Sequence, residues 1–412
     1  MSRIVILGGG FGGLYTALEL CQRSWEKQPQ ITLVDRQNQF VFLPLLYELI
    51  SGEMNEWEIA PTFQSVLANT PARWQQAEVT GIDVEDRRVS LSDGSDLDYD
   101  YLVVGLGGET AYFEVPGAKE YALPFRELAD AKRLQELLRQ WQAPEGSEPD
   151  RTLTLAIVGA GPSGVELACK LADCLGDRAD VHLIDRGHDI LQSFRADSRA
   201  AAHRALTERC VHLHLNTQVL EVGADFVRFR GADAETLLPA SATLWTAGTT
   251  VAPVVQTLPL TRNKLHQLEI LPTLQTHNRP EIFALGDNAA GSDAEGNPIP
   301  TTAQAAFQQA SYCAWNVWAL ATASEKQSPR PLLPFRYLAL GEMLSLGADN
   351  ASLSGLGMSL DGPLGYVTRR LVYLARLPSL EHQMRVGWHW MTQPLLQGLE
   401  QLWPQAAAKS DR

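Results

Sequence analysis

Short apolar runs alternate along the chain with segments of helical spacing, and glycines or an acid follow most of these runs. The run "RIVIL" at residues 3–7 has the length of a buried strand, and residues 14–21 behind its glycines have the spacing of a helix. A second run, "QITLVD" at residues 30–35, has the composition of another strand. This order of strand, helix and strand predicts a parallel sheet covered by helices, which is the α/β class.

The same order returns in the middle of the chain. "TLTLAIV" at residues 152–158 predicts a strand, "PSGVELACKLA" at 162–172 predicts a helix, and "ADVHLIDR" at 179–186 predicts a further strand. We therefore expect two Rossmann-like units, each of which binds one dinucleotide.

Both units carry glycines at the spacing G-x-G-x-x-G between the first strand and the helix. Such glycines allow a tight turn, a close approach of the backbone to a pyrophosphate, and close packing of helix on strand. The pyrophosphate would lie at the N-terminus of the helix, where free N–H groups and the helix dipole favour an anion. The glycines are Gly8, Gly10 and Gly13 in the first unit and Gly159, Gly161 and Gly164 in the second.

An acidic residue ends the second strand of each unit, Asp35 in the first and Asp185 in the second. A carboxylate at this place accepts hydrogen bonds from a ribose diol, and in a nicotinamide unit it favours NADH because it repels the 2′-phosphate of NADPH. Arg186 follows Asp185, however, and an arginine can pair with that phosphate. The sequence thus leaves the choice between NADH and NADPH open. Two complete fingerprints imply two dinucleotides, and the economical pairing is a flavin and a nicotinamide.

Composition narrows the class of protein. A length of 412 residues exceeds one ordinary core, so two or three domains are expected, and a formal charge of −14 argues against a nucleic-acid binder. The five cysteines include no Cys-x-x-Cys pair, which is typical of reduced thiols in a cytosol-like compartment and makes a dithiol mechanism a weak alternative. We expect no export signal at the start of the chain, no membrane-spanning helix and no metal site.

Three further segments resemble the flavoproteins that have two dinucleotide-binding domains, as in glutathione reductase: "YLVVGLGGE" at residues 101–109, "ATLWTAGTT" at 242–250 and "RPEIFALGDNAA" at 279–290. The resemblance implies that FAD binds the first unit and NADH or NADPH the second. In this family the Gly-Asp after such a strand reaches the ribityl chain and the pyrophosphate of FAD, although a turn aspartate is the plain alternative. The implied division is an FAD domain at 1–115 and 270–325, an NAD(P)H domain at 116–269 and a C-terminal region at 326–412.

The same resemblance implies which residues bind the two dinucleotides. The FAD set consists of Gly8, Gly10, Phe11, Gly12, Gly13, Asp35, Arg36, Pro44, Leu45, Val79, Gly105, Gly107, Gly286, Asp287, Thr302, Ala303 and Gln304. The NAD(P)H set consists of Gly159, Gly161, Pro162, Ser163, Gly164, Glu166, Asp185, Arg186, Ala247 and Gly248. For Glu166 two interpretations stay open, because an acid in the first turns of a helix is favoured by the dipole, while relatives with the same "GVE" string place it near the nicotinamide or flavin ring.

"TTAQAAFQQA" at residues 301–310 surrounds three uncharged amides with small residues. Gln304 and Gln308 share a helical face, and Gln309 is rotated from Gln308 by about 100°. An amide donates and accepts without carrying charge, which suits a neutral quinone with two carbonyls. The string is similar to one in the type II NADH:quinone oxidoreductases. The Pro-Leu-Leu segment at residues 44–46 resembles another segment of the same enzymes. This implies a catalytic set of Glu166, Gln304, Gln308 and Gln309 beside flavin and quinone; the alternative is a polar helix face.

The last eighty or so residues belong to neither nucleotide unit. Residues 330–412 hold eight basic and six acidic side chains, a net charge of +2 in a protein of charge −14. Residues 364–378 predict an amphipathic helix that carries an apolar stripe on one side and three arginines on the other. The stripe is Leu364, Val367, Leu371, Leu374 and Ala375, the arginines are Arg369, Arg370 and Arg376, and Trp388, Trp390 and Trp403 follow. Such a segment suits a membrane interface, or else packs on the body or on a second copy of the chain.

The tail resembles the cyanobacterial and plastid branch of the type II NAD(P)H dehydrogenases, which is associated with naphthoquinones such as demethylphylloquinone and with plastoquinone. We expect a non-pumping FAD enzyme that passes hydride from NAD(P)H to FAD and two electrons to a quinone. It would lie on the cytoplasmic face of a membrane, which is the thylakoid or plasma membrane if the source is cyanobacterial. A homodimer remains open. Rival interpretations are a soluble reductase for a ferredoxin-like protein, a flavin redox sensor, and a sulfide-oxidising enzyme using Cys210 and Cys313.

Overall fold

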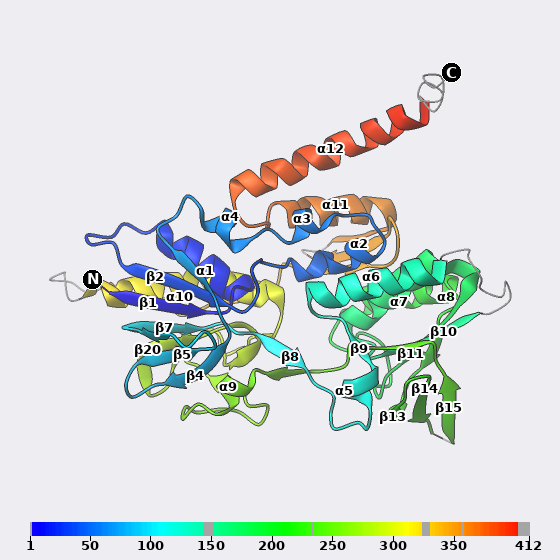
Figure 1. The fold of residues 1–412 in the computed structure, drawn as a ribbon, viewed down its shortest axis with the longest axis horizontal. Helices are drawn as coiled ribbons and strands as arrows, with labels where there is room; N and C mark the ends of the chain where they lie inside the picture. The colour runs from blue at the N-terminus through cyan, green and yellow to red at the C-terminus, as the bar shows by residue number, and fades with distance from the viewer. Residues whose placement is uncertain (1, 143–151, 233, 324–329, 356–357, 403–412) are drawn as a thin grey trace.

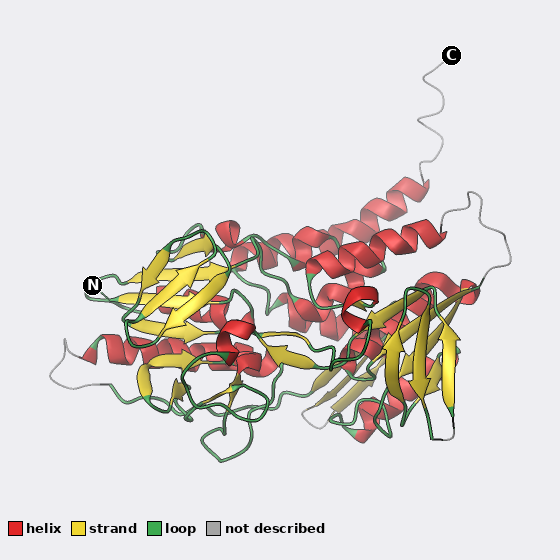
Figure 2. Cartoon of the chain, turned by 60° about the horizontal axis from the view of Figure 1, so that its bottom comes forward, coloured by secondary structure: helices red, strands yellow, loops and turns green. Residues whose placement is uncertain are grey.

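The computed structural model of the chain describes residues 2–142, 152–232, 234–323, 330–355 and 358–402. Two parallel sheets lie at opposite ends of the molecule, and the helices of the C-terminal region lie along one side (Figure 1). The view in Figure 2 separates the strands of the two ends and shows helices running between them. This arrangement agrees with the predicted α/β class.

The first sheet has six strands in the order β19-β20-β7-β1-β2-β3, and all are parallel except β19. Leu7 of β1 pairs with Val34 of β2 and with Val104 of β7, so these strands end at one edge of the sheet. The helices α1 (Phe11–Cys21) and α10 (Ala303–Ala321) pack against each other beside it. The strands are β1 (Arg3–Leu7), β2 (Gln30–Asp35), β3 (Arg73–Gln76), β7 (Tyr101–Val104), β19 (Gln275–Thr276) and β20 (Arg279–Ala284).

The second sheet has five parallel strands in the order β12-β11-β10-β16-β9. It repeats the first sheet, because β16 neighbours β10 just as β7 neighbours β1; this confirms the predicted equivalence of the two segments. The strands are β9 (Leu123–Pro124), β10 (Leu153–Val158), β11 (Ala179–Ile184), β12 (His212–His214) and β16 (Ala242–Trp245). Its helices are α6 (Leu128–Gln142), α7 (Pro162–Leu175) and α8 (Ala196–Glu208).

The chain passes between the two ends along a short antiparallel ladder of β8 (Gly108–Thr110) and β17 (Thr249–Val251), visible at the centre of Figure 1. Each end also carries a small antiparallel sheet. These sheets are β4 (Val79–Asp83), β5 (Arg88–Leu91) and β6 (Asp96–Asp98), and β13 (Gln218–Val222), β14 (Phe226–Arg230) and β15 (Glu235–Pro239). Shorter elements are η1 (Leu43–Leu45), α2 (Leu46–Ile50), α3 (Glu56–Ile59), α4 (Phe63–Leu67), α5 (Ala118–Tyr121), η2 (Gly176–Arg178), α9 (Pro253–Gln256), β18 (Leu268–Glu269), η3 (Gly286–Asn288) and β21 (Ala289–Ala290).

The C-terminal region is not purely helical. An antiparallel sheet of β22 (Glu342–Ser345), β23 (Ala351–Gly355) and β24 (Met358–Asp361) precedes α11 (Gly362–Leu374) and α12 (Leu380–Leu402). The sequence interpretation missed these strands. Within the described residues, no helix has the length and apolar character needed to cross a membrane.

Helix α11 corrects one expectation about the tail. Leu364, Val367 and Leu371 are exposed as the stripe predicts, but Arg369, expected on a solvated polar face, is completely buried. The physical reason is that the protein body offers Arg369 a carboxylate and a backbone carbonyl, which offset the cost of removing its charge from water. Trp388 is 67% exposed, whereas Trp390 donates to Glu58 Oε1 at 2.6 Å. Trp403 lies outside the described residues.

Candidate functional site

The first glycine loop joins β1 to α1 and leaves open space before the helix. A Cβ atom on Gly13 would lie 1.9 Å from the carbonyl oxygen of Gly8, so this position accepts only glycine while the helix packs so closely. A Cβ on Gly10, in contrast, would meet no atom within 4 Å. The first N–H groups of α1 lack partners within the helix. The loop therefore has both the room and the donors that a pyrophosphate requires.

Asp35 closes this loop from the neighbouring strand. Its carboxylate accepts the N–H of Gly9 at 2.6 Å and that of Gln37 at 2.7 Å. Burial raises the pKa of Asp35, and these two donors oppose the effect. The carboxylate thus has a fixed orientation at the end of β2, next to the loop.

A cavity of about 850 Å³ extends from this loop across the end of the first sheet. Its walls include seven of the seventeen residues of the predicted FAD set, namely Gly8, Gly10, Asp35, Arg36, Val79, Gly105 and Gly107. Arg126, Lys132 and Pro253, which the sequence did not single out, also line it. Other members of the set do not line the cavity: Phe11, Gly12, Gly13, Pro44, Leu45, Gly286, Asp287, Thr302, Ala303 and Gln304. The volume and the glycine-lined end fit a dinucleotide such as FAD.

The turn after β20 borders the cavity through side-chain contacts. Asp287 forms an ion pair with Arg126 at 2.8 Å, and Arg126 also donates to Thr249 Oγ1 at 3.1 Å. The fully buried Asn288 accepts the N–H of Gly107 at 2.7 Å and donates to the carbonyl of Val104 at 2.8 Å. Asp287 is therefore more than a turn residue, since it connects the first sheet to a segment that leads into the second.

The second glycine loop has the same construction as the first. A Cβ on Gly164 would lie 1.8 Å from the carbonyl oxygen of Gly159, and a Cβ on Gly161 would again meet nothing within 4 Å. Asp185 accepts the N–H of Ala160 at 2.7 Å and that of Gly187 at 2.6 Å. A second dinucleotide fits this loop for the same reasons, with Pro162 and Ser163 in the first turn of α7.

The other members of the predicted NAD(P)H set gather around this loop. A Cβ on Gly159 would lie 2.8 Å from the nitrogen of Ala247, which shows how closely β10 and the turn after β16 approach each other. The guanidinium carbon of the exposed Arg186 lies 5.6 Å from the ring centre of Phe113. That ring also packs on Gly248, where an added Cβ would lie 2.2 Å from Phe113 Cζ.

Glu166 lies in the second turn of α7 and is buried. Its Oε1 accepts the N–H of Ser345 at 2.8 Å and lies 4.0 Å from Nη2 of Arg369. Burial raises its pKa to about 7, although the nearby guanidinium of Arg369 opposes this shift. A buried carboxyl of this kind can hold and release a proton near neutral pH. It does not line the cavity described above.

The three amides at the start of α10 do not face one common space. Gln308 exchanges two hydrogen bonds with the backbone of Leu338, both at 2.9 Å, and Gln304 donates to the same carbonyl at 3.2 Å. Gln309 is buried and accepts the N–H of Gly286 at 2.9 Å. Gln309 therefore holds the turn before Asp287, whereas Gln304 and Gln308 hold Leu338 against the helix. Thr302 caps α10, its Oγ1 accepting the N–H of Ala305 at 3.2 Å.

Residues 2–310 match the family model for pyridine nucleotide-disulphide oxidoreductases. The chain belongs to this family. Within it, the chain is 47% identical to the demethylphylloquinone reductase NdbB of Synechocystis, over 95% of this chain and 96% of that protein. It is 39% identical to the alternative NAD(P)H-ubiquinone oxidoreductase C1 of Arabidopsis thaliana, over 94% of this chain and 80% of that protein. Together with the type II NADH:quinone oxidoreductase of Haemophilus influenzae, 28% identical over 84% of this chain and 85% of that protein, these relatives place the chain among the type II NAD(P)H:quinone oxidoreductases.

A solved structure agrees with the fold. The NDH2 of Plasmodium falciparum in complex with NADH superposes with a TM-score of 0.83 at 19% identity, covering 95% of this chain and 98% of that one. No disulfide joins the cysteines of the described ranges, and Cys210 is exposed whereas Cys313 is buried in α10.

Sequence reasoning missed several residues at the site, and long-range pairing explains most of these omissions. Arg126 and Asp287 are 161 residues apart, and Asn288 bonds to Gly107 across 181. No local spacing identifies such pairs. The buried Arg369 is a different case, because its position opposite an apolar stripe made it look solvated.

Proposed function

We propose that the chain is a non-pumping FAD-dependent NAD(P)H:quinone oxidoreductase. The observation that carries this proposal is the presence of two complete nucleotide loops in a chain that matches quinone-reducing relatives over nearly its whole length. When bound, FAD supplies a carrier that accepts hydride from a nicotinamide and passes two electrons to a quinone. The reaction consumes NAD(P)H, one proton and a quinone, and it yields NAD(P)⁺ and a quinol.

We assign FAD to the first glycine loop and NAD(P)H to the second. The 850 Å³ cavity at the first loop supports this order, as does the Arg126–Asp287 pair beside it. The proposed domain division, 1–115 with 270–325 and 116–269, is supported by the two separate sheets, although residues 252–254 and 257 line the cavity at the first loop. In this assignment Asp35 and Asp185 orient the two ribose groups, and the N-termini of α1 and α7 bind the pyrophosphates.

The proposed roles of Glu166 and of the glutamines differ from one another. Glu166 holds a proton at its carboxyl near neutral pH, which a quinone needs when it becomes a quinol. Gln304 and Gln308, which are half-buried, border the quinone through Leu338, which they hold in place. Gln309 keeps the turn of Gly286 in position. The quinone is proposed to be a naphthoquinone such as demethylphylloquinone, or plastoquinone.

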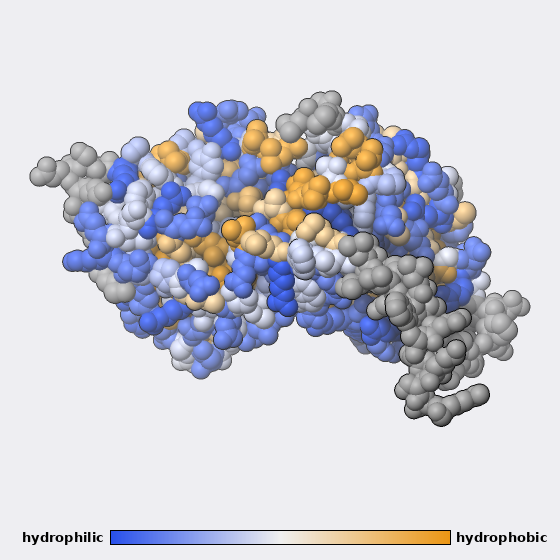
Figure 3. All heavy atoms as spheres, turned by 90° about the horizontal axis from the view of Figure 1, so that it is seen from above, coloured by the Kyte–Doolittle hydropathy of each residue, from blue (hydrophilic) through white to orange (hydrophobic). Residues whose placement is uncertain are grey.

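We further propose that the face bearing α11 and α12 contacts a membrane. Apolar residues gather on this face (Figure 3). Leu364 is 72% exposed, Leu371 59%, Leu380 71% and Trp388 67%, and an exposed apolar surface of this kind suits a lipid interface. A peripheral enzyme placed in this way would meet a quinone dissolved in the bilayer.

Steady-state oxidation of NADH and of NADPH tests the proposed function. The full chain loaded with FAD is assayed with a naphthoquinone and a benzoquinone, with and without phospholipid vesicles. We expect quinone-dependent turnover with at least one of the two nucleotides. Oxidation of the nucleotides without any quinone dependence would contradict the proposal and favour a redox sensor, whereas reduction of a ferredoxin-like protein alone would favour the soluble reductase.

A further inference from the structure

One arginine lies entirely inside the protein where α11 meets α2. Arg369 is completely buried, and its guanidinium donates to Glu48 Oε1 and, at 2.5 Å, to the carbonyl oxygen of Pro44. Both partners belong to the η1–α2 segment, which includes the Pro-Leu-Leu sequence. Glu48 is itself fully buried, so its charge has no access to water.

The same guanidinium also lies near a second carboxyl. Glu166 of α7 is 4.0 Å from its Nη2, so one cation lies between a carboxyl of α2 and a carboxyl of α7. Arg369 Nε and Glu48 Oε2 have no hydrogen-bond partner among the described residues. Removing a cation and two carboxyls from water costs free energy, and apolar groups of similar volume often stabilise a protein equally well. Stability alone therefore does not explain this arrangement.

Two further contacts connect α11, α2 and α7 around this arginine. Glu53, just behind α2, forms an ion pair with the fully buried Lys170 of α7 and accepts the hydroxyl of Tyr366 at 3.1 Å. Arg370 donates to the carbonyl of Glu53 at 3.0 Å. The inner face of α11 is therefore bound to the η1–α2 segment by several side chains at once.

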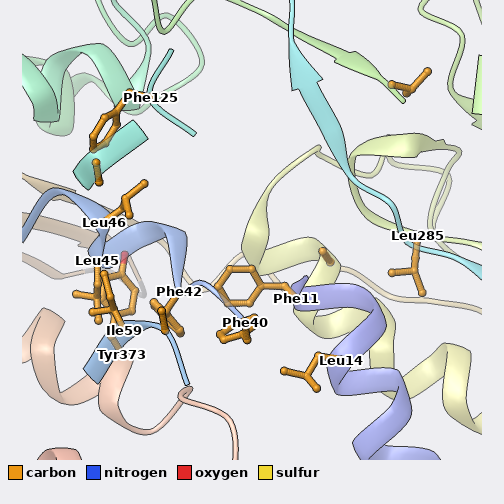
Figure 4. Close-up of a cluster of buried hydrophobic side chains, with 14 of the residues drawn as sticks. Phe11, Leu14, Phe40, Phe42, Leu45, Leu46, Ile59, Phe125, Leu285 and Tyr373 are labelled. Carbon is orange, nitrogen blue, oxygen red and sulfur yellow. The ribbon is translucent and has the colours of Figure 1, made fainter. Parts of the chain in front are cut away.

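Aromatic rings extend this connection to the first glycine loop. Tyr373 of α11 lies with its ring centre 5.2 Å from that of Phe42, and Phe42 lies 5.1 Å from Phe11, the first residue of α1 (Figure 4). The guanidinium carbon of Arg369 is 4.8 Å from the ring centre of Tyr373. These rings fill the space between α11 and the start of α1, while the polar contacts of Arg369 itself go to Glu48 and Pro44.

We propose that Arg369 is a positioning residue of the quinone half-reaction. Its guanidinium fixes the Pro44–Glu48 segment against α7 and keeps a positive charge beside the Glu166 carboxyl. The proposal rests on the proposed function. Arg369 does not touch nicotinamide in this account, so the transfer of hydride to the flavin does not depend on it. The opposite face of the same helix is the surface proposed to contact the membrane.

Stopped-flow measurement of the two half-reactions tests this proposal on the FAD-loaded full chain. The variants are Arg369→Met, which removes the charge, and Arg369→Lys, which keeps it. In Arg369→Met we expect the rate of flavin reduction by NADH to stay within about twofold of that of the unchanged chain. Flavin reoxidation by menadione should slow about tenfold or more, because a small misplacement of reacting groups lowers the rate strongly. Arg369→Lys should recover part of the rate.

The pH profile of the reoxidation rate distinguishes a positioning role of Arg369 from a general loss of structure. The charge of Arg369 lowers the pKa of Glu166, while burial and the charge of Glu48 raise it and Lys170 lowers it. Removing the guanidinium should therefore move the pH dependence of reoxidation upward in Arg369→Met but not in Arg369→Lys. Arg369→Met could fail to fold because Glu48 loses its partner. In that case the double variant Arg369→Met with Glu48→Gln removes both charges, and the rates of flavin reduction and reoxidation are measured on it instead.

Arg209→Met is the matched control, because Arg209, at the C-terminal end of α8, forms a half-buried ion pair with Asp173 of α7 at 2.7 Å. Its two rates should match those of the unchanged chain. Equal slowing of both half-reactions in Arg369→Met, or reoxidation within twofold of the unchanged chain, would overturn this inference alone. An unchanged chain that NADH reduces and menadione does not reoxidise would overturn the proposed function itself.

Discussion

Single residues show the same design at both ends of the molecule. Asp35 and Asp185 each accept two backbone N–H groups, one from the adjacent glycine loop and one from two residues further along the chain. The sequence predicted both acids because strand, glycine spacing and acid recur together. It did not predict Arg126, whose partner Asp287 comes from a segment 161 residues away.

The buried carboxyl of Glu166 predicts a specific pH dependence. Because its pKa is raised to about 7, the carboxyl holds its proton below that pH and loses it above. We expect flavin reoxidation by quinone to decline as the pH rises through about 7, and Glu166→Gln to be slower by at least about tenfold at pH 6 and to lack this decline.

Stopped-flow reoxidation between pH 6 and pH 8.5 checks this prediction, and flavin reduction by NADH in the same samples is the internal control. A Glu166→Gln profile with the same decline as that of the unchanged chain would show that another group titrates.

Arg126 predicts an effect on cofactor retention. It lines the cavity and pairs with Asp287 at 2.8 Å, so its charge lies in the cavity where FAD is proposed to bind. Arg126→Ala should weaken FAD binding about tenfold, because a hydrogen bond to a charged group contributes about 1.5–3 kcal/mol.

Equilibrium dialysis of FAD measures this affinity. Arg133→Ala removes an exposed arginine from the following helix, α6, and serves as the control. Equal FAD affinity in the Arg126 variant and in this control would remove Arg126 from the proposed site.

Among the elements, α11 shows what periodicity can and cannot predict. The spacing of Leu364, Val367 and Leu371 predicted one apolar stripe, and that stripe exists. The spacing could not say which face turns inward, because that choice depends on Glu48 and on the carbonyl of Pro44, more than 300 residues away. The strands β22 to β24 were missed for a related reason, since they are only four or five residues long and rich in serine.

The exposed stripe of α11 predicts membrane binding. A triple variant with Leu364→Ser, Val367→Ser and Leu371→Ser should bind phospholipid vesicles at least about tenfold more weakly, because each buried side chain of this size contributes about 1.5–3 kcal/mol. Thermal stability should change little, since these side chains are already exposed.

Vesicle co-sedimentation measures this binding. Leu237→Ser, an equally exposed leucine on β15, is the control and should bind as the unchanged chain does. Loss of a dimer in the triple variant, with vesicle binding unchanged, would show that a second copy of the chain covers the stripe.

At the scale of the whole molecule, the sequence predicted two nucleotide units and their order along the chain. It could not predict how the units face each other, because the β8–β17 ladder and the ion pairs around Glu53 and Glu48 join residues from distant segments. The three glutamines illustrate the limit. Their helix was predicted, but their separate partners, Leu338 and Gly286, come from other parts of the fold.

The central claim is that one chain passes two electrons from a nicotinamide to a quinone. The most direct test is anaerobic: the FAD-loaded chain is reduced with one equivalent of NADH or NADPH and then mixed with a naphthoquinone, while the flavin spectrum and the quinol are followed. We expect complete flavin reoxidation with one quinol formed for each nucleotide oxidised. A flavin that the nucleotide reduces but the quinone leaves reduced would contradict it.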